Sequence, residues 1–108
     1  MSTSLQPAQH ALGALGALGA NSILLLKALV CAKIGKGNTG LYADISAGLC
    51  VKPVKAGPRA SRWPSHEIDA IVAARMAGAS DDQVRALVTR LHELRQQQYA
   101  AVLAQVAA

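Results

Sequence analysis

The sequence predicts a small, mainly α-helical domain that carries a short β-hairpin and ends in a long C-terminal helix. Three observations favour this fold class. Hydrophobic residues make up 52% of the 108 residues, but Phe is absent and aromatic residues reach only 3%, so Ala, Leu, Val and Ile must build the core. Apolar residues recur at helical spacing through most of the chain after residue 22. Prolines interrupt that pattern within residues 51–64 and favour extended backbone there.

Length and cysteine count exclude several classes of protein. A chain of 108 residues has room for one small domain, not for a large two-domain enzyme. A disulfide scaffold needs more than two cysteines, so we expect Cys31 and Cys50 to be reduced thiols in a cytoplasmic protein. The histidines His10, His66 and His92 are scattered, and their spacing predicts no metal site. No cofactor is expected.

The N-terminal segment, residues 1–21, differs from the rest of the chain because it repeats Ala-Leu-Gly three times. Each Gly costs a helix about 1 kcal/mol relative to Ala, so we expect a flexible arm of unknown role. The alternative is a small membrane-associated protein that uses residues 11–34, a mostly apolar stretch close to the ~20 residues that a span needs. Lys27 and Lys33 within that stretch argue against insertion.

Two short helices joined by a glycine-containing turn are predicted next. The first starts at Ser22, the turn covers residues 35–38, and the second helix covers residues 40–47. The expected N-cap residues are Asn21 or Ser22 for the first helix and Asn38 or Thr39 for the second. Such a pair is a candidate helix-turn-helix.

A β-hairpin, or wing, is predicted over residues 51–64. Pro53 and Pro58 exclude helix, and Gly57 with Pro58 supplies the turn. We expect Trp63 in the core. Four basic residues lie along this hairpin: Lys52, Lys55, Arg59 and Arg62.

Two further helices complete the predicted fold. The third starts at Pro64 or Ser65 and ends at Gly78. The fourth follows a capping box formed by Ser80 and Gln83, and its apolar stripe extends over a helix of roughly 40 Å, longer than the domain needs. We expect a second copy of the chain to cover this stripe. The alternative is one long helix that folds back over its own domain. The residues expected in self-association are Val84, Leu87, Val88, Leu91 and Leu94.

The net charge of +5 is unevenly distributed. Between Lys27 and Arg62 the chain has seven basic residues and one acidic residue, whereas acidic residues outnumber basic ones by one outside that window. Clustered positive charge is typical of proteins that bind nucleic acid or an anionic membrane. A well-solvated surface is the alternative interpretation.

The stretch from Gly48 to Ala70 carries three successive motifs: Gly48-Leu49-Cys50-Val51-Lys52-Pro53-Val54-Lys55-Ala56-Gly57-Pro58-Arg59, then Arg62-Trp63, then Ser65-His66-Glu67-Ile68-Asp69-Ala70. Together they resemble AlpA-type phage regulators, small DNA-binding proteins related to excisionases and to the MerR-like winged helix. The resemblance covers roughly residues 24–75. Leu41-Tyr42 also match the family, whereas Gly40, Ala43 and Asp44 depart from its recognition helix.

This resemblance implies a winged helix-turn-helix domain over residues 22–78. The C-terminal helix lies outside the resemblance, and its apolar stripe is the reason to expect self-association over residues 79–108. The implied function is non-enzymatic: a transcriptional regulator of mobile-element or prophage genes that binds double-stranded DNA as a homodimer or cooperative array. An excisionase-type role, bending DNA for an integrase, would use the same surface, and RNA polymerase is a further candidate partner. No small-molecule substrate is expected, because residues 35–40 lack the Walker pattern and no Ser/His/Asp or Cys/His set is evident.

A short helix fits the major groove, and basic side chains of a wing reach phosphates. For Tyr42 a place at the edge of the core is the alternative, and for Asn38 a helix cap. The expected DNA-binding residues are Lys36, Asn38, Thr39, Tyr42, Lys52, Lys55, Arg59 and Arg62.

Overall fold

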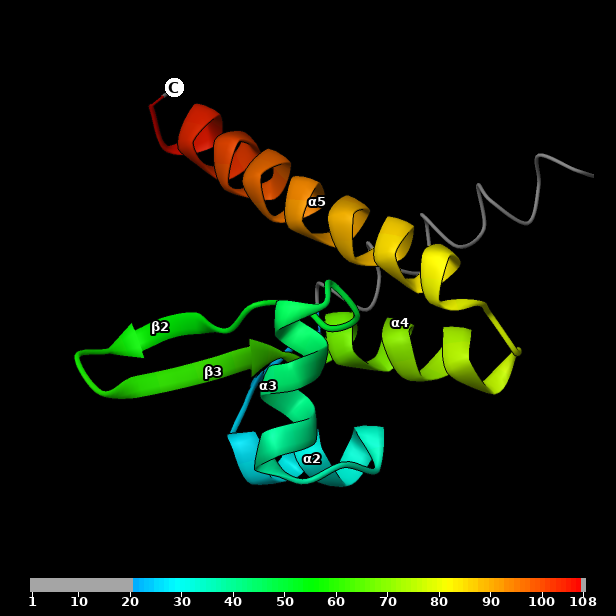
Figure 1. The fold of residues 1–108 in the computed structure, drawn as a ribbon. Helices are drawn as coiled ribbons and strands as arrows, with labels where there is room; N and C mark the ends of the chain where they lie inside the picture. Colours follow the sequence, from blue (N-terminus) through cyan, green and yellow to red (C-terminus); the bar gives the residue numbers. More distant parts are fainter. Residues whose placement is uncertain (1–20, 108) are drawn as a thin grey trace, which may run out of the picture.

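The computed structural model describes residues 21–107, which form four helices and a small antiparallel sheet (Figure 1). In chain order the elements are β1 (Leu24–Leu25), α2 (Lys27–Ile34), α3 (Asn38–Ser46), β2 (Val54–Gly57), β3 (Ala60–Pro64), α4 (Ser65–Met76) and α5 (Asp81–Ala107). This confirms the predicted fold class: mainly α, with a hairpin wing and a long C-terminal helix. The predicted arm lies outside the described residues, apart from Asn21.

The sheet has three strands, with β3 at its centre. β2 pairs with β3 to form the predicted hairpin, and β1 pairs with the other edge of β3 through Leu25 and Trp63. The prediction that the first helix starts at Ser22 is therefore wrong. Residues 24–25 are extended because they pair with the open edge of β3, and the helix starts only at Lys27.

Ser22 does not cap α2; its side chain binds the N-terminus of α4. Its Oγ accepts a hydrogen bond from the backbone N–H of His66 at 3.3 Å and lies 2.8 Å from His66 Nδ1. The Ile23 N–H in turn donates to Ser65 Oγ at 2.9 Å. The segment that enters β1 thus binds the N-terminus of α4, and Leu26 precedes α2 without a side-chain cap.

The turn between α2 and α3 follows the predicted glycines. Gly35 has φ 72°, a left-handed conformation that favours glycine, and ends α2. α3 starts at Asn38, two residues earlier than predicted, after an extended Gly37 that makes no side-chain cap. The expectation that Asn38 or Thr39 caps this helix is wrong, because both lie inside its first turn. Asn38 Oδ1 instead accepts a weak hydrogen bond from Cys31 Sγ at 3.7 Å.

One hydrophobic core joins the sheet to all four helices of the described chain. Trp63 is fully buried as predicted, and its Nε1 donates to the Val51 carbonyl at 3.2 Å. The buried apolar residues of this core are Leu25, Val30, Leu41, Cys50, Val51, Trp63, Ile68, Ile71, Val84, Val88 and Leu91. Since α5 contributes three of them, the expected boundary at residue 78 does not divide the core.

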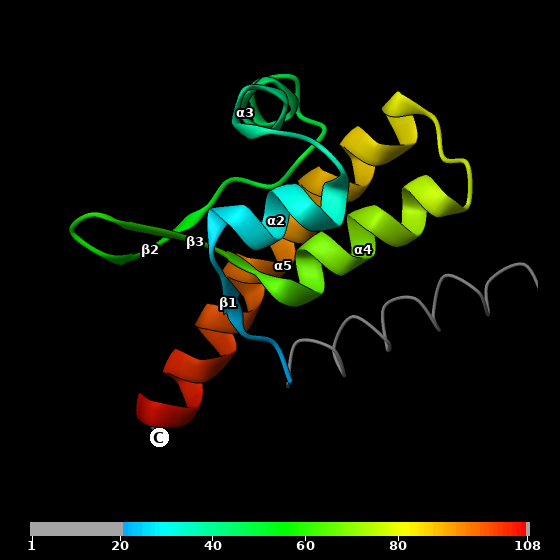
Figure 2. The same ribbon diagram turned by 90° about the horizontal axis from the view of Figure 1, so that it is seen from below.

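The prediction that the first half of α5 mediates self-association is wrong for Val84, Val88 and Leu91. These side chains are at most 4% exposed because they fill the core of their own chain, and Leu87 packs against the same core. Leu94 is half-buried. The second half of α5 projects beyond the domain in both views (Figures 1 and 2). Its exposed apolar side chains are Tyr99, Val102, Leu103 and Val106.

The capping box before α5 is confirmed. The Gln83 N–H donates to Ser80 Oγ at 3.2 Å, and the Ser80 N–H donates to Gln83 Oε1 at 2.8 Å. Gly78, with φ 82°, follows the end of α4. Within residues 21–107, no helix combines the length and the apolar character that crossing a membrane requires.

Candidate nucleic-acid interface

All six Asp and Glu side chains of the chain lie in the described residues, and each forms an ion pair of 3.1 Å or less. The pairs are Lys33–Asp69, Lys36–Asp44, Arg75–Asp81, Arg85–Asp82, Arg90–Glu93 and Arg95–Glu67. The chain has eleven Lys and Arg residues, so five of them have no Asp or Glu partner within residues 21–107. This number equals the net charge of +5. These five, called the wing cations below, are Lys27, Lys52, Lys55, Arg59 and Arg62.

The wing cations are grouped around the hairpin. Lys52 precedes β2, Lys55 lies in β2, Arg59 lies in the turn and Arg62 lies in β3. Lys27 is the first residue of α2, directly after the β1 segment that pairs with β3. The excess positive charge of the molecule is therefore concentrated around one element. Charge grouped in this way attracts a polyanion more strongly than the same charge spread over the surface.

A groove of about 460 Å³ separates the hairpin from α2 and α3. No acidic residue lines it, and the Nζ of Lys27 lies 5.7 Å from the centroid of the Tyr42 ring. Lys55 is the cross-strand partner of Ser61, a lining residue, so the two side chains share one face of the hairpin. The lining residues are Leu26, Lys27, Ala28, Tyr42, Arg59, Ser61, Arg62 and Trp63.

The structure brings together about half of the predicted DNA-binding residues. Tyr42, Arg59 and Arg62 line the groove, and Lys55 lies beside it. Tyr42 is 46% exposed, so it is not a core residue. Asn38 and Thr39 are exposed at the start of α3 but outside the groove lining.

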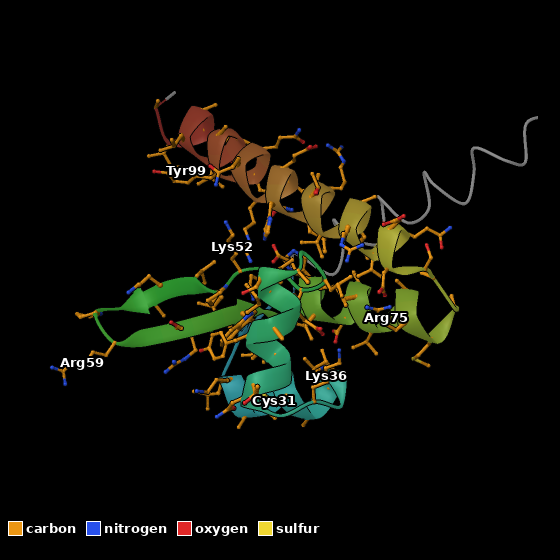
Figure 3. All side chains as sticks on the ribbon, in the orientation of Figure 1. Cys31, Lys36, Lys52, Arg59, Arg75 and Tyr99 are labelled. Atoms are coloured by element: carbon orange, nitrogen blue, oxygen red, sulfur yellow. The ribbon has the colours of Figure 1, made fainter. Side chains whose placement is uncertain are left out.

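Lys36 and Lys52 lie apart from this group. Lys36 pairs with Asp44 at 2.7 Å and lines a separate hollow of about 310 Å³ between α2, α3 and α4. Arg75 lines the same hollow, and Figure 3 shows it on α4, away from the hairpin. Lys52 lies on the side of the hairpin that faces α5, whereas Arg59 is at the tip (Figure 3). The rim cations of the hollow are Lys33, Lys36 and Arg75, and each has a carboxylate partner, so the hollow is not a second anion surface.

Lys27 was not among the predicted site residues. The sequence placed it inside a helix from Ser22, which hid its position beside the hairpin. The signal that could have found it is the four-residue apolar run of residues 23–26. A run of this length is compatible with a strand, which would place Lys27 at the end of the sheet.

The start of the wing, Val51 and Lys52, is called the wing root here. Two side chains of α5 bind its backbone: the Lys52 N–H donates to His92 Nε2 at 3.1 Å, and Arg95 Nη2 donates to the Lys52 carbonyl. Burial is the main cause that lowers the pKa of His92 below its ordinary value of 6.5, and the positive charge of Arg95 adds to the effect.

The described residues hold two cysteine thiols and no metal-ligand cluster. Residues 21–107 contain no cluster of three His, Cys, Asp or Glu side chains that could hold a metal ion. Cys31 and Cys50 are both free thiols. Burial raises the pKa of Cys50 to about 11, so this thiol stays protonated and is a poor nucleophile.

Comparison with known proteins does not assign the chain to a family: no family model matches it, and neither the curated proteins nor the solved structures contain a significantly similar chain. Its function is therefore proposed from the residues and the geometry described above.

Proposed function

We propose that the protein is a DNA-binding transcriptional regulator of the AlpA type that contacts double-stranded DNA with α3 and the hairpin wing. The single observation that supports this most directly is the distribution of charge. All six Asp and Glu side chains are paired with other cations. The five cations that remain lie around the hairpin, and four of them line or adjoin the groove beside α3. Binding, not catalysis, is the role that this surface favours.

In the proposed complex α3 approaches the major groove, where base edges present a distinguishable pattern of donors and acceptors. Thr39 and Tyr42 are exposed on α3 and available for such contacts. Asp44 would repel phosphate on its own, but Lys36 neutralises it through their 2.7 Å ion pair. This pairing removes a penalty and also removes Lys36 as a free phosphate contact.

The wing cations are proposed to bind phosphates on the flanking backbone. Arg59 lies at the tip of the hairpin (Figure 3), where it suits insertion into the adjacent minor groove. Phosphate contacts hold the protein in register on the duplex but carry little sequence information. Sequence preference must therefore come from α3 and from any deformation of the DNA. An excisionase-type role is the alternative within the same surface, and it requires bending of the duplex.

Self-association is proposed for the projecting half of α5. Single DNA-binding modules of this size bury only about 600–1,000 Å², which limits specificity for one site. Tyr99, Leu103 and Val106 lie at the spacing of one helix face, and no charged residue follows Arg95. A neutral apolar face meets no electrostatic repulsion from an identical copy, so we propose a second copy of this chain as its partner.

The test compares two double variants that remove the same net charge. Lys55→Gln with Arg59→Gln removes two wing cations, and Lys33→Gln with Arg90→Gln removes two cations that already have carboxylate partners. Fluorescence anisotropy with duplex from around the protein's own gene measures the affinity. At 0.1 M salt we expect the first variant to bind on the order of 10–100-fold more weakly. The second should bind within about threefold of the wild type.

Equal losses in the two variants would contradict the proposed interface, because net charge alone would then explain binding. A scrambled duplex of the same length completes the design. Tighter binding to the native duplex supports a regulator with an operator, and equal binding to both would overturn that part of the proposal.

A further inference from the structure

We propose that His92 and Arg95 of α5 are positioning residues for the wing, and that protonation of His92 releases the wing root and weakens DNA binding. This inference rests on the proposed function, since it concerns the orientation of the wing cations toward DNA. It adds a proton-sensitive link between the C-terminal helix and the DNA-binding surface.

Side chains from elsewhere in the chain form hydrogen bonds with the backbone of both wing-root residues, Val51 and Lys52. Trp63 donates to the Val51 carbonyl at 3.2 Å, while His92 and Arg95 bind the N–H and the carbonyl of Lys52. Arg95 is itself fixed, because its guanidinium also contacts both oxygens of the buried Glu67 at 2.6–3.0 Å. The position of the root is thus set by α5 and by the core beneath it.

The rest of the wing has few other supports. β1 pairs only with Trp63 and Pro64 at the base of β3, so the outer part of the hairpin pairs only with itself. Figure 1 shows β2 and β3 projecting away from the helices. Pro53 follows the root directly and has a restricted φ, so the direction of the root carries over into β2. A change at Lys52 therefore redirects the cations further along the hairpin.

His92 accepts the Lys52 N–H only when Nε2 carries no proton. Protonation places an N–H opposite an N–H, and the hydrogen bond is lost. The charged groups that act on His92 are Arg95 of the same helix, Lys52 of the wing root and Glu67 of α4. The two cations oppose its protonation and Glu67 favours it, while burial opposes it most strongly.

The sign of the effect follows from linkage. A histidine whose pKa is lowered in the folded state stabilises the fold fully above its unfolded pKa of about 6.5. That stabilisation is lost as the pH falls through the folded pKa. The hydrogen bond between His92 and the Lys52 N–H is lost over the same pH range, as the pH falls through the folded pKa of His92. Added positive charge on any histidine would by itself tighten DNA binding at low pH, so the proposal predicts the opposite sign from general electrostatics.

The experiment measures DNA affinity by anisotropy at pH 7.5 and at a low pH, set one unit below the His92 pKa that NMR titration of the ring gives, at constant ionic strength. The wild type should bind at least threefold more weakly at the low pH. His92→Gln keeps an acceptor oxygen close to the position of Nε2 without titrating, so its affinity should not fall at the low pH. His66→Asn is the control: it removes the imidazole that is hydrogen-bonded to Ser22, and it should keep the pH dependence of the wild type. Wild-type binding that is unchanged or tighter at the low pH, or a fall that persists in His92→Gln, would overturn the proposal.

A second measurement needs no DNA. In NMR spectra of the free protein, the amide resonance of Lys52 should titrate with the same pKa as the His92 ring. DNA binding without this titration would overturn the present inference and leave the proposed function intact. Titration without any DNA binding would overturn the proposed function and leave the link between His92 and the wing root intact.

Discussion

Glu67 is a carboxylate in the core, 1% exposed, and Arg95 is its ion-pair partner on another helix. A buried charge is tolerated only when its partner and hydrogen bonds are in place. The main effect of this pair on stability is that losing Arg95 would leave the buried Glu67 carboxylate without a partner. The pair also links α5 to α4.

The Glu67–Arg95 pair leads to a stability prediction. Arg95→Met leaves the Glu67 carboxylate buried and unpaired, so the free energy of unfolding should fall by about 3–5 kcal/mol in urea denaturation. Adding Glu67→Gln to Arg95→Met removes the buried charge, and the double variant should be more stable than Arg95→Met alone. A double variant that is less stable than the single one would contradict this account.

At the same scale, the sequence predicted the region of excess charge but not which cations are free. Lys33 pairs with Asp69 and Arg95 pairs with Glu67, across 36 and 28 residues of chain. Such partners are set by tertiary packing, and no local pattern reveals them. Lys36 is a predicted DNA-binding residue because it lies in the turn before α3. Its ion pair with Asp44 depends on the orientation of α3, which the local sequence does not reveal.

The elements were predictable where their signals are local. The capping box of Ser80 and Gln83 and the turn at Gly35 depend on neighbouring residues, and both formed as expected. β1 was missed because residues 23–26 are a continuous apolar run that leads straight into a helix. Only its pairing with β3, about forty residues away, makes it a strand.

The strand β1 offers a matched pair of substitutions. Leu25 is 3% exposed and packs in the core, whereas its neighbour Leu24 is 52% exposed. Leu25→Ala should lower the free energy of unfolding by about 2–5 kcal/mol, and Leu24→Ala should change it by less than about 0.5 kcal/mol. Thermal or urea unfolding measures both. Had these residues belonged to an exposed helix, the two changes would have similar effects, and that result would refute the strand.

On the scale of the whole molecule, α5 has two parts that differ in burial. Its first half completes the core, and its second half carries the exposed face of Tyr99, Val102, Leu103 and Val106. The same apolar periodicity continues through both halves, so the sequence could not divide them. The structure therefore moves the proposed self-association surface towards the C-terminus.

This surface is testable by the mass of the protein in solution. Sedimentation velocity should show concentration-dependent dimerisation in the wild type, and Leu103→Glu should abolish it, because a charge cannot be buried unpaired in an apolar contact. Val88→Ala is the comparison within the core: it should lower stability yet leave dimerisation unchanged. A wild type that remains monomeric at all concentrations would contradict the proposed partner.

We propose that the five wing cations, not the net charge as such, bind the phosphates of DNA. The dependence of the association constant on salt concentration tests this directly. Five phosphate contacts predict a slope of log K against log salt of up to about −4.5. Lys55→Gln with Arg59→Gln should reduce its magnitude by about 2, and Lys33→Gln with Arg90→Gln should leave it unchanged. A slope near zero, or equal reductions in both variants, would contradict the claim.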